Sequence, residues 1–355
     1  MKTAIVLGTR PEIIKLAPLI KQLNKKSTSV IFTGQHYDYN LSLRFIDQLG
    51  LAKPNHLMKI SHTNPALQIA DVIRNLSKIL EKEKPDTVIV QGDTNTVLAA
   101  GIASLKSNIP VSHVEAGLRS HDWRMPEEHN RIEIYHISEL LFTPTTSSRY
   151  NLISEKVHGK IFVTGNTVID AINQFTKISK KHSKISIDDD YVLMTLHRSE
   201  NVDKKEILST IIKAVIDSKQ DFVFPVHPRT LKRLHDFNLY TKLKRSKNMR
   251  ILGPVGYFEI LELMKNCQFI LTDSGGIQEE ATAPSIRKKV VVVRKTTDRP
   301  ESISTGFSEI AGTSYKGILR AIKNNSKNPG VPSRKSPFGS GNTTKLIIKH
   351  LKANI

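Results

Sequence analysis

Short apolar runs alternate with amphipathic stretches along almost the whole chain. The runs are typical of buried strands, and the stretches between them repeat apolar residues at intervals of three and four, which is typical of surface helices. In the first half the predicted strands are Ala4–Leu7, Val30–Thr33, Thr87–Val90, Pro110–Val114, Leu140–Thr143 and Ile161–Val163. The predicted helices there are a segment with Ile13, Leu16, Ala17, Ile20 and Leu23 on one face, then Leu41–Leu49, Leu67–Leu80, Thr96–Leu105 and Asn130–Ser138.

The second half repeats this rhythm. Its predicted strands are Tyr191–Thr195, Asp221–Pro225, Met249–Leu252, Phe269–Thr272 and Val290–Arg294, and its helices are Lys204–Asp217, Thr230–His235, Tyr257–Asn266, Gly276–Ala283 and Asn342–Lys352. Regular alternation of strand and helix indicates parallel sheets with helices on both faces. We therefore predict an α/β fold of two Rossmann-like, doubly wound domains that face each other across a cleft.

Length also favours two domains, because 355 residues exceed what one hydrophobic core usually organises. The polar stretch Asn173–Asp190 places the boundary near Thr167. The expected domains are residues 1–167, with the candidate acidic residues, and 168–340, with the candidate phosphate site. Residues 341–355 are expected to form a final helix. The sequence does not assign this helix to one domain, and one option is that it packs back on the first.

The composition indicates the cellular compartment and excludes some kinds of binding partner. The single cysteine, Cys267, fits a reducing environment, the first apolar run is too short for a signal peptide, and no segment has the roughly 20 apolar residues that span a bilayer. We expect a soluble cytoplasmic protein without a membrane partner.

The net charge of +20 raises the question of nucleic-acid binding. Residues 1–166 hold 20 Lys and Arg against 15 Asp and Glu, and the rest of the chain holds 33 against 18. The excess lies in helix-like surface segments without interleaved aromatic residues that could stack on bases. A solvated lysine-rich surface explains it, and we expect no nucleic-acid partner.

Two strand–glycine–helix segments suit a phosphate. Ser274, Gly275 and Gly276 follow the apolar strand Phe269–Thr272, and Gly8, Thr9 and Arg10 follow the first strand. Glycines at a helix N-terminus leave amide groups pointing outward, and such amides bind phosphates. A carboxylate one turn later can bind ribose hydroxyls, so an anionic sugar nucleotide would fit both segments.

Polar side chains also follow most of the other strands. Asp93 and Thr94 follow one strand, Glu115 follows the next, and Glu127 and Glu128 open a helix behind it. His197 and His227 occupy similar places in the second half. Helix caps and turns explain each cluster singly, but ligands in parallel sheets bind at these strand ends, and the repeated clustering favours a site. No residue pair has zinc-ligand spacing, and we expect no metal.

Taken together, these motifs resemble a known family. GTRPE (8–12), GQH (34–36), GDT (92–94), HVEAGLR (113–119), PEEHNR (126–131), TGN (164–166), HRSEN (197–201), DSGGIQEEA (273–281) and TDRPE (297–301) occur in this order. The series is similar to the non-hydrolysing UDP-N-acetylglucosamine 2-epimerases over roughly residues 1–312. The resemblance implies two Rossmann domains of the GT-B kind, inversion of carbon 2 of a UDP-sugar without cofactor or metal, and a homodimer.

The chemistry and the resemblance together nominate site residues. Catalytic candidates are Asp93, Glu115, Glu127, Glu128 and His197. Candidates for substrate binding are Arg10, Lys15, Arg131, Ser274, Gly275, Gly276, Glu280, Arg299 and Glu301, with Glu280 and Glu301 on the ribose. Members of the family can be activated by their substrate, and the candidate positions for this are Gln35, His36, Arg198 and His227.

Alternatives remain at this stage. The family often has Asp where this chain has Tyr135, so a modified UDP-sugar such as a diacetamido uronic acid is an alternative substrate. A GT-B glycosyltransferase would share the fold and the donor, but it would have little use for Asp93, Glu115 and Glu127. A nucleic-acid-binding protein would explain the charge and none of the strand-end carboxylates.

Overall fold

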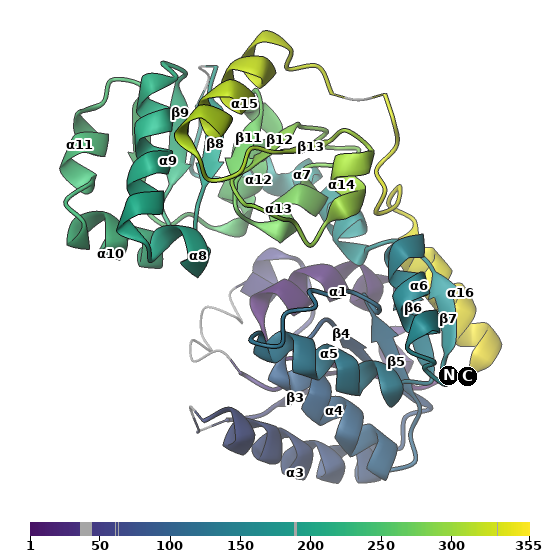
Figure 1. Ribbon diagram of the computed structural model, residues 1–355. Helices are drawn as coiled ribbons and strands as arrows, with labels where there is room; N and C mark the ends of the chain where they lie inside the picture. The colour runs from purple at the N-terminus through teal and green to yellow at the C-terminus, as the bar shows by residue number, and fades with distance from the viewer. Residues whose placement is uncertain (36–44, 61, 63, 188–189, 332) are drawn as a thin grey trace. The chain divides into compact units, whose positions relative to one another are not determined.

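The computed structural model describes residues 1–355 apart from 36–44, 61, 63, 188–189 and 332. The chain divides into two compact units, Met1–Ala171 with Phe338–Ile355, and Ile172–Pro337. Each unit has one sheet in which the paired strands run parallel, with helices between successive strands (Figure 1). This confirms the predicted α/β class with two Rossmann-like, doubly wound parts.

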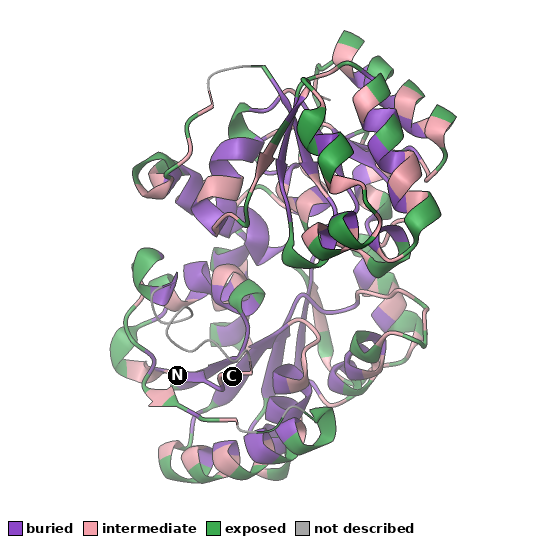
Figure 2. Ribbon diagram, turned by 90° about the vertical axis from the view of Figure 1, so that its left-hand side faces the viewer, coloured by how far each residue is buried: buried purple, intermediate pink, exposed green. Residues whose placement is uncertain are grey.

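Among the described residues, the sheet of the first unit has seven strands in the order β3-β2-β1-β4-β5-β6-β7. Their bounds are β1 Thr3–Leu7, β2 Thr28–Phe32, β3 His56–Leu57, β4 Thr87–Gln91, β5 Val111–Val114, β6 Leu140–Thr143 and β7 Lys160–Val163. The central strands are buried along their whole length (Figure 2). Such strands are continuous apolar runs in the sequence because both faces of the sheet are covered.

Helices cover both faces of this sheet. Their bounds are α1 Arg10–Gln22, α3 Pro65–Glu83, α4 Asn95–Lys106, α5 Pro126–His136 and α6 Thr146–Ser154, with a 3-10 turn at Lys25–Ser27. The next helix, α7 Thr167–His182, begins in this unit and continues into the second. α3, α4 and α5 pack side by side over one face (Figure 1), where Val6 and Val90 belong to their core cluster. Ile5 and Ile89 alternate with these residues along the strands and are equally buried, because α1 packs on β1 and β4.

The last helix, α16 (Thr343–Asn354), belongs to the first unit. It packs against α1, and His350 stacks on Phe162 of β7 with 4.1 Å between ring centroids. The buried Asp170 carboxylate accepts hydrogen bonds from the amides of Thr343 (3.2 Å) and Thr344 (3.0 Å). This carboxylate therefore caps the start of α16, where negative charge favours the helix.

The sheet of the second unit has six strands among the described residues, in the order β10-β9-β8-β11-β12-β13. Their bounds are β8 Val192–Thr195, β9 Phe222–Pro225, β10 Met249–Leu252, β11 Ile270–Thr272, β12 Val290–Val292 and β13 Ser308–Ile310. The helices are α8 Ser199–Val202, α9 Lys205–Asp217, α10 Pro228–Asp236, α11 Tyr240–Arg245, α12 Tyr257–Asn266, α13 Gly275–Glu280, α14 Pro300–Ser304 and α15 Tyr315–Lys327.

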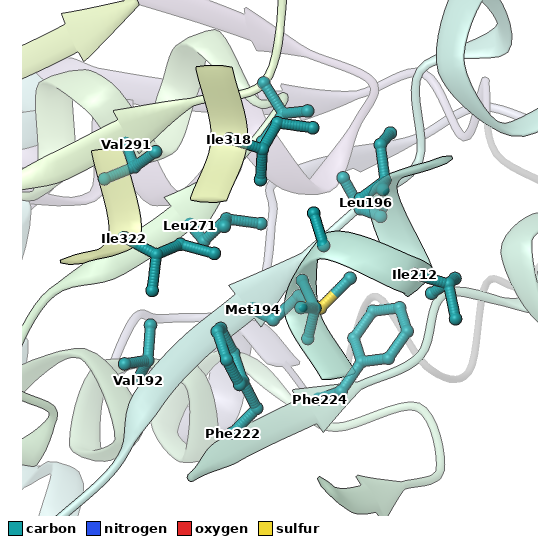
Figure 3. Packing of buried hydrophobic residues seen from close by; sticks show 14 of the residues in the cluster. Val192, Met194, Leu196, Ile212, Phe222, Phe224, Leu271, Val291, Ile318 and Ile322 are labelled. Carbon is teal, nitrogen blue, oxygen red and sulfur yellow. The ribbon is translucent and has the colours of Figure 1, made fainter. Parts of the chain in front are cut away.

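The core of the second unit lies between this sheet and the pair α9 and α15. Met194 and Phe224 of neighbouring strands point toward Ile212 of α9, and Ile318 and Ile322 of α15 close the cluster beside them (Figure 3). These side chains are almost fully buried, and each such burial contributes about 1.5–3 kcal/mol. In the described part of the chain, no helix is both long and apolar enough to cross a membrane.

Several elements occur where none was predicted, namely the helices α6, α7, α8, α11, α14 and α15 and the strands β3 and β13. α7 continues to His182 through the polar stretch that begins at Asn173, because Phe175 is buried against Tyr257 and Phe258 of α12. α6 buries only Ser148 and Leu152, which is too little to give a helical pattern. The predicted helix Leu41–Leu49 lies partly outside the described residues, and residues 45–48 of it are helical.

Each sheet has one place where the chain reverses its direction of strand addition. In the first unit this point lies between β1 and β4, and in the second it lies between β8 and β11. Loops at the carboxyl ends of such strand pairs diverge to opposite faces and leave a crevice where ligands bind. The predicted glycine segments after β1 and β11 stand at these two points.

Candidate active site

In the first unit, the loops after β1 and β4 are packed tightly together. A Cβ atom on Gly8 would come within 2.3 Å of Thr96 Oγ1 and 2.4 Å of Thr33 Oγ1, so no larger residue fits there. The two hydroxyls are 2.9 Å apart, and Thr96 also donates to the side-chain carbonyl of Gln35 (2.7 Å). Gln35 therefore lies against the start of α4, and its neighbour His36 lies outside the described residues.

Glu115 stands directly after β5 in a left-handed backbone conformation, with φ of 68°. Its carboxylate is buried and binds Lys15 Nζ of α1 at 2.6 and 2.7 Å and Gln91 Nε2 of β4 at 2.7 Å. A non-glycine residue in this conformation costs on the order of 1 kcal/mol and is often found at functional sites. The ion pair with Lys15 joins two strand ends that the sequence alone could not connect.

Asp93 follows β4 and pairs with Arg131 of α5. Arg131 donates to Asp93 Oδ2 at 2.8 Å (Nε) and lies 2.6 Å from it through its terminal nitrogen. The side chain of Asn130 donates to the Asp93 carbonyl at 2.8 Å. Both contacts fix the loop, and the Asp93 side chain keeps 26% of its surface exposed.

Glu128 differs from Asp93, although both bind Arg131. Its carboxylate is buried and accepts hydrogen bonds from the Ser120 amide (3.0 Å), the His121 amide (3.1 Å) and Arg131 (2.9 Å). Burial works against ionisation, but these donors lower the pKa of Glu128 below its usual value. By contrast, Glu127 is exposed on the first turn of α5. Glu128 is thus occupied in holding the loop, and Glu127 is open to solvent.

His113 and Tyr135 lie beneath this cluster. Burial lowers the pKa of His113 to about 4, so its ring is neutral and Nε2–H donates to the Gly92 carbonyl at 2.7 Å. The Tyr135 ring meets His113 edge-on at 5.1 Å, and the Arg119 guanidinium lies 4.5 Å from its centroid. The buried Tyr135 ring therefore packs on the histidine that holds the Gly92 carbonyl, next to Asp93.

In the second unit, the loops after β8 and β11 are joined by a buried carboxylate. Asp273 accepts hydrogen bonds from the amides of His197 (3.0 Å) and Arg198 (3.0 Å) and from Asn201 Nδ2 (3.2 Å). Burial lowers the pKa of His197 below its usual value. Its ring lies 5.8 Å from that of His227, so these two predicted histidines are brought together.

α13 begins at the two glycines that were predicted to open a helix, and their binding of phosphate stays a prediction. Ser274 caps the helix through the Ile277 amide, and Gly276 is exposed at its first turn. A Cβ atom on Gly275 would come within 2.9 Å of Asp298 Oδ1. Although burial raises it, the pKa of Asp298 is lowered to about 2 by Arg299, Arg294 and Arg198.

The remaining candidates have varied surroundings. Arg299 is buried and pairs with Glu279, which is fully buried in α13. Glu280 and Glu301 are half-buried in α13 and α14. In the first unit Arg10 is exposed, and its guanidinium lies 4.8 Å from the centroid of the Phe45 ring.

Several residues that organise these clusters were not nominated from the sequence. Glu12, Gln91, Asp273 and Asp298 lie inside or beside the quoted motifs, but their roles depend on contacts with distant residues. The only local signal was the spacing of Thr9 and Glu12, which is typical of a helix capping box. In the part of the chain that the structure describes, no three His, Cys, Asp or Glu side chains gather closely enough to hold a metal ion.

Known proteins resemble this chain over its whole length. A family model described as UDP-N-acetylglucosamine 2-epimerase matches residues 20–352. The UDP-N-acetylglucosamine 2-epimerase of Methanocaldococcus jannaschii is 43% identical over 368 residues, which cover 99% of this chain and 99% of that protein. A UDP-2,3-diacetamido-2,3-dideoxy-D-glucuronate 2-epimerase of Pseudomonas aeruginosa is 31% identical over 360 residues, 99% of each.

A solved structure agrees with these matches. The crystal structure of Methanocaldococcus jannaschii UDP-GlcNAc 2-epimerase in complex with UDP-GlcNAc and UDP is similar with a TM-score of 0.86. The two sequences are 42% identical there, and the match covers 100% of both chains.

Proposed function

The chain belongs to the UDP-N-acetylglucosamine 2-epimerase family, and we propose that it interconverts UDP-N-acetylglucosamine and UDP-N-acetylmannosamine by inverting carbon 2. The observation that carries this proposal is the pair of carboxylates at adjacent strand ends, Asp93 and Glu115, each held by a cation from another helix. No cofactor has a part in the proposed reaction.

The chemistry explains why carboxylates and cations are both needed. The proton on carbon 2 is not acidic, because no carbonyl group lies beside it. Departure of the diphosphate from carbon 1 creates an oxocarbenium-like centre that acidifies this proton, so elimination gives UDP and a glycal. Addition of UDP after the proton returns on the other face gives the 2-epimer. Groups that bind the developing charges accelerate such a step.

We assign the proton transfers to the first unit. Asp93, Glu115 and Glu127 supply acid, base and cation-stabilising groups, and positioned acid–base groups typically contribute a factor of about 100–10,000 in rate. Lys15 and Arg131 hold two of these carboxylates. Glu128 was nominated with them, and its hydrogen bonds support a positioning role for it.

We assign nucleotide binding mainly to the second unit. Ser274, Gly275 and Gly276 would present amides to the diphosphate, with His197 beside them. Arg10 of the first unit would add a cation. Glu280 and Glu301 would hold the ribose hydroxyls, with Arg299 keeping the loop in place through Glu279. Activation by substrate would involve Gln35, His36, Arg198 and His227.

A modified UDP-sugar is the second candidate substrate. It is supported by the Pseudomonas aeruginosa relative, whose name specifies a diacetamido glucuronate. Tyr135 is buried at a position where members of the family often have Asp. This difference supports the hypothesis that the enzyme accepts other sugar substituents. Turnover of both UDP-sugars under the same conditions separates the two.

Solvent exchange at carbon 2 tests the reaction. In heavy water the proton leaves carbon 2 for a carboxylate and exchanges, so product and recovered substrate should both gain deuterium there in NMR spectra. Small amounts of free UDP and glycal should accompany it. Epimerised product without deuterium would refute the elimination route, and no epimer from either UDP-sugar would refute the proposed activity.

We also propose that the enzyme works as a cytoplasmic homodimer and that its product is used in polysaccharide biosynthesis. The resemblance to the family supports the dimer, and the single buried Cys267 suits a reducing compartment. Light scattering of the purified protein measures the oligomeric state directly.

A further inference from the structure

One buried acid in the first unit has no part in the proposed chemistry. Glu12 lies on the first turn of α1, is 2% exposed, and touches two loops. Its Oε2 atom accepts hydrogen bonds from the amides of Gly8 and Thr9, the latter at 3.1 Å. Its Oε1 atom accepts a hydrogen bond from Thr94 Oγ1 at 2.6 Å.

A helix cap explains only half of this arrangement. The capping box of α1 requires the contact between Glu12 and the Thr9 amide, and it is satisfied by Oε2 alone. The other oxygen reaches a residue 82 positions away, on the loop after β4. A cap could be exposed to solvent, whereas this carboxylate is buried at the point where the two loops meet.

The two loops that Glu12 joins carry proposed site residues. Arg10 follows Thr9, and Asp93 precedes Thr94. Starting from the function proposed above, we propose that Glu12 is a positioning residue that latches the Gly8–Arg10 loop to the Asp93–Thr94 loop. The latch sets the position of Asp93 relative to Arg10 within the first unit, and displacement of reacting groups by about 1 Å can lower turnover 100-fold.

Charged groups on the neighbouring elements are engaged elsewhere. Lys15 of α1 pairs with Glu115, and Asp93 of the second loop pairs with Arg131. Burial raises the pKa of Glu12 to about 7, although its hydrogen bonds from Thr94, Gly8 and Thr9 oppose the shift. The ionised carboxylate accepts from all three donors, so the latch is complete in this form and is weakened when the group is protonated.

Exchange of backbone amides tests the latch without any assay of activity. Thr94→Val removes the hydroxyl and keeps the shape, Thr94→Ser restores the hydroxyl, and Thr145→Val removes a comparable helix N-cap at the start of α6 as a control. Hydrogen–deuterium exchange at the Gly8 and Thr9 amides should be at least fivefold faster in Thr94→Val. It should be unchanged in Thr145→Val and close to wild type in Thr94→Ser.

Kinetics then measure the effect on the proposed site. Thr94→Val should lower kcat for epimerisation about tenfold or more with less than a threefold change in KM, and Thr94→Ser should recover most of it. For wild type, kcat should rise with pH through about 7 as Glu12 ionises. Glu12→Gln should lack this rise, because its side chain does not titrate.

The outcomes separate this proposal from the function on which it rests. Unchanged amide exchange at Gly8 and Thr9 in Thr94→Val, or an equal kcat loss in Thr145→Val, would reduce Glu12 to a helix cap and overturn the latch. A wild-type protein that epimerises no UDP-sugar would overturn the proposed function, whereas the exchange data would still decide whether the two loops are latched.

Discussion

The two units use the same topological position in different ways. At the β1/β4 switch point, Asp93 pairs with Arg131, and beside it Glu115 pairs with Lys15, so long cationic side chains from other helices hold the carboxylates. At the β8/β11 switch point, Asp273 is fully buried and binds mainly backbone amides of the neighbouring loop.

This difference separates acids suited to chemistry from acids suited to architecture. The Asp93 carboxylate keeps 26% of its surface exposed and can reach a ligand, whereas Asp273 has no exposed surface. A buried carboxylate that binds several amides orders the loops around it. We therefore expect the reacting groups at this edge of the first unit and the binding groups at the corresponding edge of the second.

The largest expected effect is on the stability of the second unit. Asp273→Ala leaves buried amide donors without their acceptor, and we expect the free energy of unfolding to fall by about 3–5 kcal/mol. Asp236→Ala removes a half-exposed acid of the same unit and should cost less than about 1 kcal/mol. Urea denaturation measures both, and a small effect of Asp273→Ala would remove the contrast between the units.

The next effect is on catalysis in the first unit. Asp93→Asn should lower turnover at least 100-fold, about 2.7 kcal/mol in activation free energy, while folding and UDP binding persist. The fold survives because Arg131 keeps its partner Glu128. Glu115→Gln should behave in the same way. Glu133→Gln, on the exposed side of α5, is the matched control, and near wild-type rates in Asp93→Asn would show that this acid is architectural.

The smallest expected effect concerns Glu12, the buried acid of the first unit that joins two loops. The pKa of Glu12 is raised from 4.5 to about 7 in the folded protein, so wild type loses stability as pH rises from about 4.5 to 7. Glu12→Gln does not titrate, and its stability relative to wild type should increase by about 2 kcal/mol between pH 5 and pH 8.

Thermal or urea unfolding of both proteins across this pH range measures the difference. A difference that does not change with pH would mean that Glu12 ionises in the folded protein as readily as in the unfolded chain. The latch would then be independent of pH near neutrality.

Local patterns were sufficient for most of the fold. Apolar runs such as Thr87–Val90 are buried on both faces, and their period identifies strands wherever they occur in the chain. α7 escaped prediction because its stability depends on Phe175 packing against α12, some 80 residues later. α6 escaped because only two of its residues are buried.

The residues whose side chains suit catalysis or binding could also be identified from the sequence, because strand ends and glycine-led helix starts have local signatures. Asp93, Glu115, Ser274 and Gly276 were nominated in this way, and their roles in the reaction remain predictions. Their partners were not visible. Nothing within a few residues of Glu115 indicates Lys15, and nothing near Glu12 indicates Thr94.

The sequence by itself determined the α/β class, most of the strands and helices in their order, and the strand ends where polar side chains gather, because hydrophobic period and turn residues act over a few residues. Only the tertiary structure decided which of these acids stay partly exposed and which are buried among several donors. That distinction depends on burial and on donors brought in by other elements, as Arg131 reaches Asp93 and the His197 amide reaches Asp273. Burial and pairing arise when distant segments meet, so no local pattern carries them.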